Sequence, residues 1–495
     1  MTVALVESRV IASSSASAGR AESSLRLLRA MATGVRKTPT WQVKAMLLRL
    51  LGGDLEALAN DALGEFCRRS RQAGVVPLRI GFKRAHLVSD PALVRHVLLD
   101  NAANYDKVTP AFDAVRVVLG NGLLTSAGAF WKRQRRIAQP AFHGESVKRF
   151  GPILTRMAAE TADEWEQAAR AGTTVDACTD MMRVTLRAVA ETLFGDDLGD
   201  DAAEINRVFP TILSCLASRV ASPVRPPLWL PTVNNRRLRP ALAALDRVVE
   251  RLIATKRWRL AEGGAGGQAR PDLLTILMMA RDEETGESMN DAQLRDEVMT
   301  MLIAGHETTA NALSWLWVLL DRHPDEQERL RAELVAATGG RPPTVDDVAN
   351  LPRLKAVIQE TLRLYPPVWM FDRRALGPDG LGDTRVGPGD LVIFVPYAIH
   401  RLPQLWSDPE VFRPERFEPG REEQKNKFAY LPFGAGPRIC LGASFAMIES
   451  QIIVGTLLAR FRVRLAGPEP VTPTPQVTLR TSRPVLLRLK PAALA

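Results

Sequence analysis

The sequence has few cysteines, and their arrangement would neither bind zinc nor form a disulfide framework. The 495 residues contain only Cys67, Cys178, Cys215 and Cys440, with no CxxC pair and no histidine at zinc-ligand spacing. This scatter excludes a disulfide scaffold and a structural zinc site, and it favours a reducing compartment. We expect the first three cysteines to be small buried hydrophobic residues. Cys440 needs a separate explanation.

Long apolar segments are also absent. No run reaches the roughly 18 apolar residues of a transmembrane helix, and no clean apolar segment marks a secretory signal. Residues 1–40 are rich in serine and arginine and poor in acidic residues, as are organellar transit peptides and disordered extensions. We favour a disordered extension, followed by a single domain over residues 41–495. The apolar, basic residues 41–51 either pack on that domain or contact a membrane surface.

Basic runs interleaved with aromatic residues are absent, which argues against nucleic-acid binding. The 65 Lys and Arg residues exceed the 55 Asp and Glu residues, and the net charge is +10. Such an excess favours an acidic protein partner or an anionic membrane face, or it is simply a solvated basic surface. No GxGxxG motif opens a βαβ unit, so no flavin domain is predicted.

Helical periodicity dominates the pattern that is present. The longest helix is predicted from the N-cap candidates Asn290 and Asp291 to Arg322, before Pro324. About thirty residues would extend some 45 Å, so this helix must cross the middle of the molecule. Further helices are predicted within 150–259, with a proline-rich break at 222–227, and at 325–337, 354–364 and 440–461. A hairpin at 77–90, strands near 386–395 and a flexible loop at 262–272 complete a mainly α fold with minor β, in one domain without internal repeats.

The most informative stretch is FGAGPRICLG at residues 433–442. Its two glycines permit a tight backbone path before Cys440, which we expect at the start of a helix. A helix N-terminus carries partial positive charge and free N–H groups, which favour a thiolate. Phe433 would cover the sulfur on its open side, and Arg438 would bind an anion. The alternative is a buried cysteine beside a glycine-rich turn.

Four weaker motifs stand in the same chain. Glu360 and Arg363 form an ExxR pair on one helix face, which by itself is usually a surface ion pair. The stretch AGHETT at 304–309 places small residues inside the long helix, where they either leave room for a flat group or form a helix-packing groove. Trp131 and Arg135 lie four residues apart on a basic helix, and residues 414–417 read PERF.

In this order and spacing, the motifs resemble those of the cytochrome P450 family. The resemblance extends from about Pro77 to Pro484, with a loose match at the predicted turn 382–390. It implies the cytochrome P450 fold, with a long central helix over haem and small β-sheets, haem b as the cofactor and Cys440 as the proximal ligand to iron. The residues implied to bind haem are Trp131, Arg135, Ala304, Arg373 (with Arg374 as a close competitor), Phe433, Arg438, Cys440 and Gly442.

The resemblance also gives roles to the remaining motifs. Thr308 would stabilise the bound dioxygen, and Glu307 would help to relay protons. Glu360, Arg363 and Arg416 would form a buried charge network that braces the proximal side, since a third charge lets each polar group be satisfied. The substrate pocket would be lined by residues 108–118 and by Ile303, Ala304, Val368, Trp369, Met370, Phe371 and Val477.

The implied activity is haem-thiolate monooxygenation: dioxygen and two electrons place one oxygen atom in a C–H or C=C bond and release the other as water. The mostly apolar pocket residues favour a lipophilic substrate such as a terpenoid, fatty acid, steroid or polyketide. Electrons would come from a separate ferredoxin or flavodoxin with its NAD(P)H reductase. That donor would dock on the basic helix at Lys132, Arg133 and Arg136.

Two other functions are compatible with the sequence. A peroxygenase, isomerase or dehydratase on the same haem fold commonly lacks the acid–threonine pair, so Glu307 and Thr308 favour the monooxygenase. A haem gas sensor or carrier would bind ligands without turnover, and no sensor or output domain is visible. The composition suggests a monomeric, cytoplasmic bacterial enzyme; the N-terminal residues leave an organellar location as the alternative.

Overall fold

The computed structural model describes residues 54–81, 83–142, 144–195, 199–220, 222, 225–261, 272–281, 286–418 and 426–492. The predictions for residues 1–40 and 41–51, and for nearly all of the loop at 262–272, lie outside these residues. Within the described part of the chain, no helix is long and apolar enough to cross a membrane.

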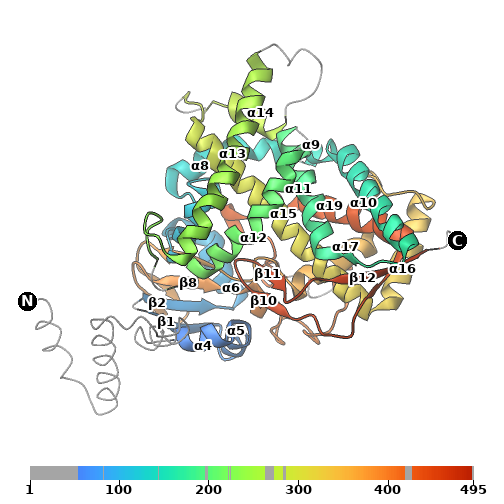
Figure 1. Ribbon diagram of the computed structural model, residues 1–495. Coiled ribbons are helices and arrows are strands. Elements are labelled where there is room, and N and C mark those ends of the chain that lie inside the picture. The colour runs from blue at the N-terminus through green and yellow to red at the C-terminus, as the bar shows by residue number, and fades with distance from the viewer. Residues whose placement is uncertain are drawn as a thin grey trace, which may run out of the picture.

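A single long helix, α15 (Asp291–Arg322), runs through the centre of the molecule (Figure 1). Its 32 residues correspond to about 48 Å. The helix begins with a capping box, in which the backbone N–H of Gln293 donates to the Asn290 side chain and the backbone N–H of Asn290 donates to the Gln293 side chain, each at 2.9 Å. It ends before Pro324, since the residue preceding a proline avoids helical geometry. The predicted central helix is therefore confirmed, including both ends.

Most of the hydrophobic core lies where other helices surround α15. Helices α11 (Ala177–Phe194), α17 (Pro352–Leu364) and α19 (Ala443–Arg460) pack against it, and α10 (Gly151–Ala171) packs against α11 and α19. Fully buried tryptophans fill the junctions: the ring of Trp317 lies 5.4 Å from that of Trp165, and Trp315 stacks on Tyr365 at 3.9 Å. The other α-helices of the described residues are α4 (Leu55–Asn60), α5 (Ala62–Ser70), α6 (Pro91–Arg95), α7 (Pro110–Leu119), α8 (Gly128–Ala138), α9 (Gly144–Lys148), α12 (Asp200–Val220), α13 (Val233–Ala261), α14 (Leu273–Met279), α16 (Pro324–Thr338) and α18 (Pro396–Ile399).

The sheets are small and lie at the edge of the helical body (Figure 1). The largest has the order β1-β2-β8-β5-β3, in which only β2 and β8 are parallel. Its strands are β1 (Val75–Ile80), β2 (Lys83–Val88), β8 (Leu391–Phe394), β5 (Phe371–Ala375) and β3 (Tyr105–Asp106). A second sheet contains β4 (Val175–Asp176), β12 (Leu486–Pro491) and β9 (Phe461–Leu465), and two hairpins are formed by β6 (Asp379–Leu381) with β7 (Thr384–Val386) and by β10 (Pro473–Pro475) with β11 (Leu479–Thr481). The mainly α fold with minor β is confirmed.

One local prediction needs correction. The helix after the cysteine loop begins at Ala443 rather than at Cys440, because residues 436–438 form a separate 3-10 turn, η8 (Gly436–Arg438). The loosely matching stretch 382–390 begins with the turn of the β6–β7 hairpin, whose Gly382 adopts a φ of 58°. Such left-handed backbone favours glycine, so this loosely matching segment still forms a tight turn.

Candidate functional site

The loop that carries Cys440 is folded back on itself and buttressed by a neighbouring helix. The backbone N–H of Cys440 donates to the Phe433 carbonyl at 2.9 Å, and Gly434 and Gly436 both have a φ of 69°. A Cβ atom on Gly436 would lie 1.8 Å from the backbone oxygen of Leu98, in the π-helix η1 (His96–Asp100). Only glycine fits this close approach. The glycines of the motif therefore serve a geometry that presents Cys440.

Cys440 differs from the other three cysteines in its surroundings. It is exposed, whereas Cys215 is buried and Cys67 and Cys178 are partly buried against the core. Protein atoms nevertheless crowd around its sulfur, and this desolvation raises the pKa of the thiol. The backbone N–H of Gly442 and the charges of Arg135 and Lys107 oppose that rise but do not overcome it. The expected thiolate-favouring N–H is thus present, although it does not dominate.

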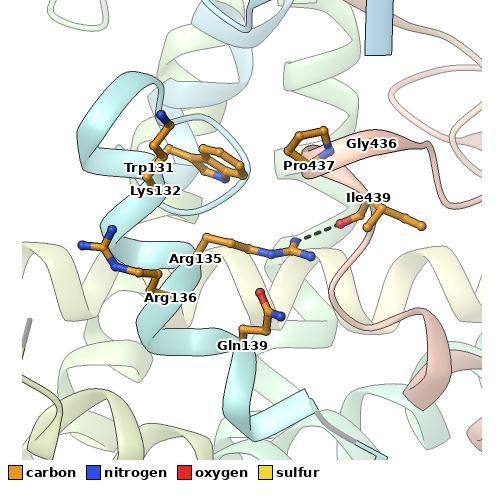
Figure 2. A pocket seen from close by; sticks show the side chains of 8 residues that line it. All are labelled: Trp131, Lys132, Arg135, Arg136, Gln139, Gly436, Pro437 and Ile439. Carbon is orange, nitrogen blue, oxygen red and sulfur yellow. Dashed lines mark hydrogen bonds between the residues drawn. The ribbon is translucent and has the colours of Figure 1, made fainter. Parts of the chain in front are cut away.

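Helix α8 packs beside the cysteine loop with its basic face (Figure 2). Arg135 donates from Nη1 to the Ile439 carbonyl at 2.9 Å, and the Arg438 guanidinium lies over the Trp131 ring at 3.6 Å. The expected pair therefore meets the loop at two adjacent residues, Trp131 at Arg438 and Arg135 at Ile439. Between helix and loop lies a hollow of about 440 Å³, lined by Trp131, Lys132, Arg135, Arg136, Gln139, Gly436, Pro437 and Ile439 (Figure 2).

Three cationic side chains are gathered in the interior next to this loop. Lys107 and Arg373 are buried, and Arg438 is half-buried, with an Nη1 atom that has no protein partner among the described residues. Burial lowers the pKa of Arg373 to about 10 and that of Arg438 to about 9. Burial, with the charges of Arg373 and Arg438, holds the pKa of Lys107 well below its usual range. The buried carboxylate of Asp372 interacts with Lys107 and Arg373 and offsets part of this positive charge. Clustered buried cations are costly unless anions balance them, so the remaining positive charge fits a further anionic group.

The structure separates the two competing arginines of β5. Arg374 forms a salt bridge with Asp106 at 2.6 Å, whereas Arg373 turns inward toward the cation cluster. Sequence reasoning missed Lys107, which donates to the Leu124 carbonyl at 3.3 Å. A single lysine before a proline-capped helix carries no pattern that would have marked it.

The middle of α15 is buried except on one narrow face. Ala304, Gly305 and Thr308 are partly exposed between buried neighbours, and the Thr308 hydroxyl donates to the Ala304 carbonyl at 2.8 Å. Ala304 and Thr308 lie one turn apart, as a face that borders a group would require. Gly305 follows the helix-packing alternative instead, because a Cβ atom there would lie 2.8 Å from Cγ2 of Val189 on α11.

Glu307 points away from Thr308 toward the β10–β11 hairpin. Its Oε1 atom accepts hydrogen bonds from Thr478 Oγ1 at 2.7 Å and from Arg480 at 3.0 and 3.2 Å. Sequence reasoning did not find Thr478 and Arg480, since they stand 171 and 173 positions from their partner.

The charged residues of ExxR and PERF meet in the interior. Arg363 contacts both carboxylate oxygens of Glu360 at 2.7 and 2.9 Å, and Arg416 reaches Oε1 of Glu360 at 3.4 Å. All three residues are at most 1% exposed. Arg363 also donates to the carbonyls of His400, Pro409 and Val411. The structure therefore brings the predicted network together, and the surface-pair alternative is wrong.

The predicted pocket residues are divided between two parts of the molecule. Ile303 and Val477 adjoin the core cluster formed by α11, α12, α13 and α15. Trp369 is buried against Phe66 in the cluster beneath the large sheet, where its indole N–H donates to the Gln476 carbonyl at 2.9 Å, and Met370 packs on the same cluster. Trp369 therefore packs in this core cluster, and its assignment to the pocket stays a prediction. Val368 is exposed.

Comparisons with known proteins agree with this arrangement. The family model described as Cytochrome P450 matches residues 52–488. Among the curated relatives, the chain is 35% identical to "Cyclooctatin synthase" of Streptomyces melanosporofaciens, over 87% of this chain and 91% of that one. It is 32% identical to "Pentalenene oxygenase" of Streptomyces avermitilis, over 85% and 91%. A crystal structure of the cytochrome P450DA heme domain superimposes with a TM-score of 0.78 at 26% identity, covering 90% of this chain and 95% of that one.

The family model covers most of the sequence, and the chain aligns with most of the length of both relatives. The chain belongs to the cytochrome P450 family and is a haem-dependent monooxygenase that uses dioxygen, a substrate and a redox partner.

Proposed function

We propose that this monooxygenase hydroxylates a lipophilic terpenoid, with Cys440 as the thiolate ligand of its haem. The observation that carries the cofactor assignment is the cluster of Lys107, Arg373 and Arg438 beside Cys440. A haem carries two propionates, which would neutralise such a cluster and accept from the unpartnered Nη1 of Arg438. Bound haem supplies dioxygen binding and O–O bond cleavage, which a thiolate ligand favours.

The residues of the chain then have separate tasks. Lys107, Arg373 and Arg438 would hold the propionates, and Trp131 stacks against the Arg438 guanidinium. Phe433 and Gly442 belong to the loop that fixes Cys440. Ala304, on α15, would border the haem on the side away from Cys440. Glu360, Arg363 and Arg416 hold that loop's surroundings rigid without touching the reacting atoms.

Proton delivery is assigned to Glu307 and Thr308. The Thr308 hydroxyl lies on the partly exposed face of α15, and the neighbouring carboxylate can take a proton from water and pass it to that hydroxyl. We expect Thr308→Ala to lower product formation by about a hundredfold while NADPH oxidation continues and releases hydrogen peroxide. Product and peroxide are measured against NADPH consumed.

The matched control is Thr309→Ala, which removes a hydroxyl that donates to the Gly305 carbonyl on the buried side of the same turn. It should keep product and NADPH coupled. Equal product yield from Thr308→Ala and wild type would contradict the assignment. Turnover with peroxide alone, and none with dioxygen and electrons, would favour the peroxygenase alternative.

Removing a cation from the cluster should weaken haem binding without lowering the stability of the haem-free protein. Lys107→Met removes a buried cation that Arg373 and Arg438 repel and that Asp372 attracts only in part, so the apoprotein should unfold at equal or higher urea concentration. The same change removes a propionate partner, so haem should transfer to apomyoglobin about tenfold faster. Unchanged haem transfer in Lys107→Met would remove Lys107 from the site.

The substrate class rests on relatives and on apolar surroundings. "Cyclooctat-9-en-7-ol 5-monooxygenase" of Streptomyces melanosporofaciens is 36% identical over 79% of this chain, and its name, like that of "Pentalenene oxygenase", points to a terpenoid. Ile303 and Val477 add apolar surface beside α15. Binding spectra with cyclooctat-9-en-7-ol, pentalenene, a fatty acid and a steroid test the proposal. Stronger responses to the fatty acid or the steroid would overturn the terpenoid class.

We also propose a redox partner, a cellular location and a domain organisation for this protein. An acidic ferredoxin would dock on the hollow beside α8, where Lys132 and Arg136 are exposed. Arg133 is a weaker contact than the sequence suggests, because it already pairs with Glu287 at 2.9 Å. We propose a monomeric cytoplasmic enzyme whose residues 41–495 form one domain after an N-terminal extension.

A further inference from the structure

The β10–β11 hairpin carries two side chains that reach the buried acid of α15. Thr478 and Arg480 both donate to Oε1 of Glu307, at 2.7 Å and at 3.0 and 3.2 Å. Asn311, one turn along α15, donates to Thr478 Oγ1 at 3.1 Å and so fixes the direction of its hydroxyl. The side chain of Glu307 is thus held by residues of the β10–β11 hairpin rather than by residues of its own helix.

The hairpin itself is fixed to a third part of the fold. The backbone N–H of Leu479 donates to the Pro367 carbonyl at 2.9 Å, and the Trp369 indole donates to the Gln476 carbonyl at 2.9 Å. Leu479 is fully buried. Because both ends of the turn are anchored to the segment that follows α17, Arg480 has little freedom to leave Glu307.

Arg480 also lies between the buried carboxylate and the solvent. Glu307 is 3% exposed, whereas the Arg480 side chain is 23% exposed. A carboxylate buried at this depth has little contact with water of its own, and solvent comes near it at the partly exposed Arg480 side chain. Among the described residues that contact Glu307 side-chain oxygens, Arg480 is the one that opens to the surface.

We propose that Arg480 and Thr478 are positioning residues for proton delivery, and that protons enter from the surface beside Arg480. The inference rests on the proposed role of Glu307. Solvent gives the proton to the Glu307 carboxylate, which rotates on α15 and passes it to the Thr308 hydroxyl. The hydroxyl gives up its own proton to the dioxygen that is being reduced, so neither residue keeps an added proton. The Arg480 guanidinium keeps its own protons throughout and returns the carboxylate to the β11 side.

A merely structural role is the competing explanation, in which the ion pair only pins the hairpin to α15. Then loss of Arg480 would lower stability and would leave proton transfer unchanged. The two explanations differ in whether the effect of Arg480 depends on the acid at position 307.

The test uses the full-length holoenzyme with a plant-type [2Fe–2S] ferredoxin, its reductase, NADPH and cyclooctat-9-en-7-ol as the added lipophile. The variants are Arg480→Met, Arg480→Lys, Thr478→Val, Glu307→Gln and the double variant Arg480→Met with Glu307→Gln. Arg488→Met, an exposed arginine on β12, is the matched control. NADPH oxidation is measured in H2O and D2O, urea midpoints report stability, and crystal structures report the Glu307 rotamer.

Loss of the charge-assisted hydrogen bonds should slow NADPH oxidation roughly tenfold to a hundredfold in Arg480→Met and raise the solvent isotope effect. Arg480→Lys should restore part of the rate. Thr478→Val should give a smaller change of the same kind, and Glu307 should leave the β11 side in Arg480→Met crystals. In the Glu307→Gln background, Arg480→Met should have no further effect, because both act through one group.

The possible results distinguish the positioning role of Arg480 from the proton-relay role of Glu307. If Glu307→Gln slows turnover but Arg480→Met keeps the wild-type rate and isotope effect, the positioning role is overturned and the role of Glu307 stands. If Glu307→Gln itself behaves as wild type, both are overturned. Additive effects of the two substitutions, or a lower urea midpoint with an unchanged isotope effect, would make Arg480 a structural residue.

Discussion

Cys440→Ser is expected to abolish the ferrous–CO absorption band that names the family and to reduce monooxygenase turnover below detection. Serine keeps the shape of the side chain and the hydrogen bond from the Cys440 backbone to Phe433. Its hydroxyl, however, remains protonated and cannot donate electron density as a thiolate does. The protein should still fold, because Gly434 and Gly436 shape the loop independently of the sulfur.

Cys178→Ser is the matched control for this prediction. The Cys178 sulfur lies 3.4 Å from the Thr481 hydroxyl, a contact that a serine can also make. This variant should keep the wild-type band and turnover. A folded, haem-containing Cys440→Ser protein with the wild-type ferrous–CO band would refute the assignment of Cys440 as the ligand.

The second large effect is expected at Glu360. Glu360→Ala removes the carboxylate that Arg363 and Arg416 share in the interior, and it removes the acceptor of the Arg413 backbone N–H at 2.8 Å. Removing one partner of a buried ion pair typically costs about 3–5 kcal/mol of unfolding free energy. Since total stability is only about 5–15 kcal/mol, we expect a large drop in the urea midpoint and poor recovery of holoenzyme.

Glu164→Ala provides the comparison, because Glu164 pairs with Arg183 on the surface, with side chains 44% and 39% exposed. An exposed pair contributes at most about 1 kcal/mol. Its loss should leave haem content unchanged. A Glu360→Ala protein as stable as Glu164→Ala would show that hydrogen bonds from Arg363 to carbonyls suffice without the carboxylate.

The helices could be predicted well because their signals are local. The N-cap at Asn290 and the proline at 324 fix both ends of α15 within one turn of the chain. The start of α19 was placed three residues too early, since the periodic pattern runs into the cysteine loop while Gly436 and Pro437 form a 3-10 turn there. Only the packing of Gly436 against Leu98 reveals why that turn is required.

The residues of the candidate site also fall into those that local motifs reveal and those that only the packing reveals. Cys440, the ExxR pair and the Glu307–Thr308 pair were found because each lies in a short, recognisable motif. Lys107, Thr478 and Arg480 were missed. No spacing rule connects Lys107 with Arg373, or Glu307 with Arg480, because their proximity depends on how strands and helices pack.

The sequence alone determined the family, the central helix and the cysteine that we propose as the ligand. Each of these is marked by short motifs whose residues lie close together in the sequence. Tertiary structure decided which charges became neighbours: the buried cations next to Cys440, and the strand that holds Glu307. Side-chain direction and burial follow from packing, and they set both the pKa of a cation and the path of a proton. For Cys440 and Glu307 alike, the motif gives the chemical group and the packed fold gives its surroundings.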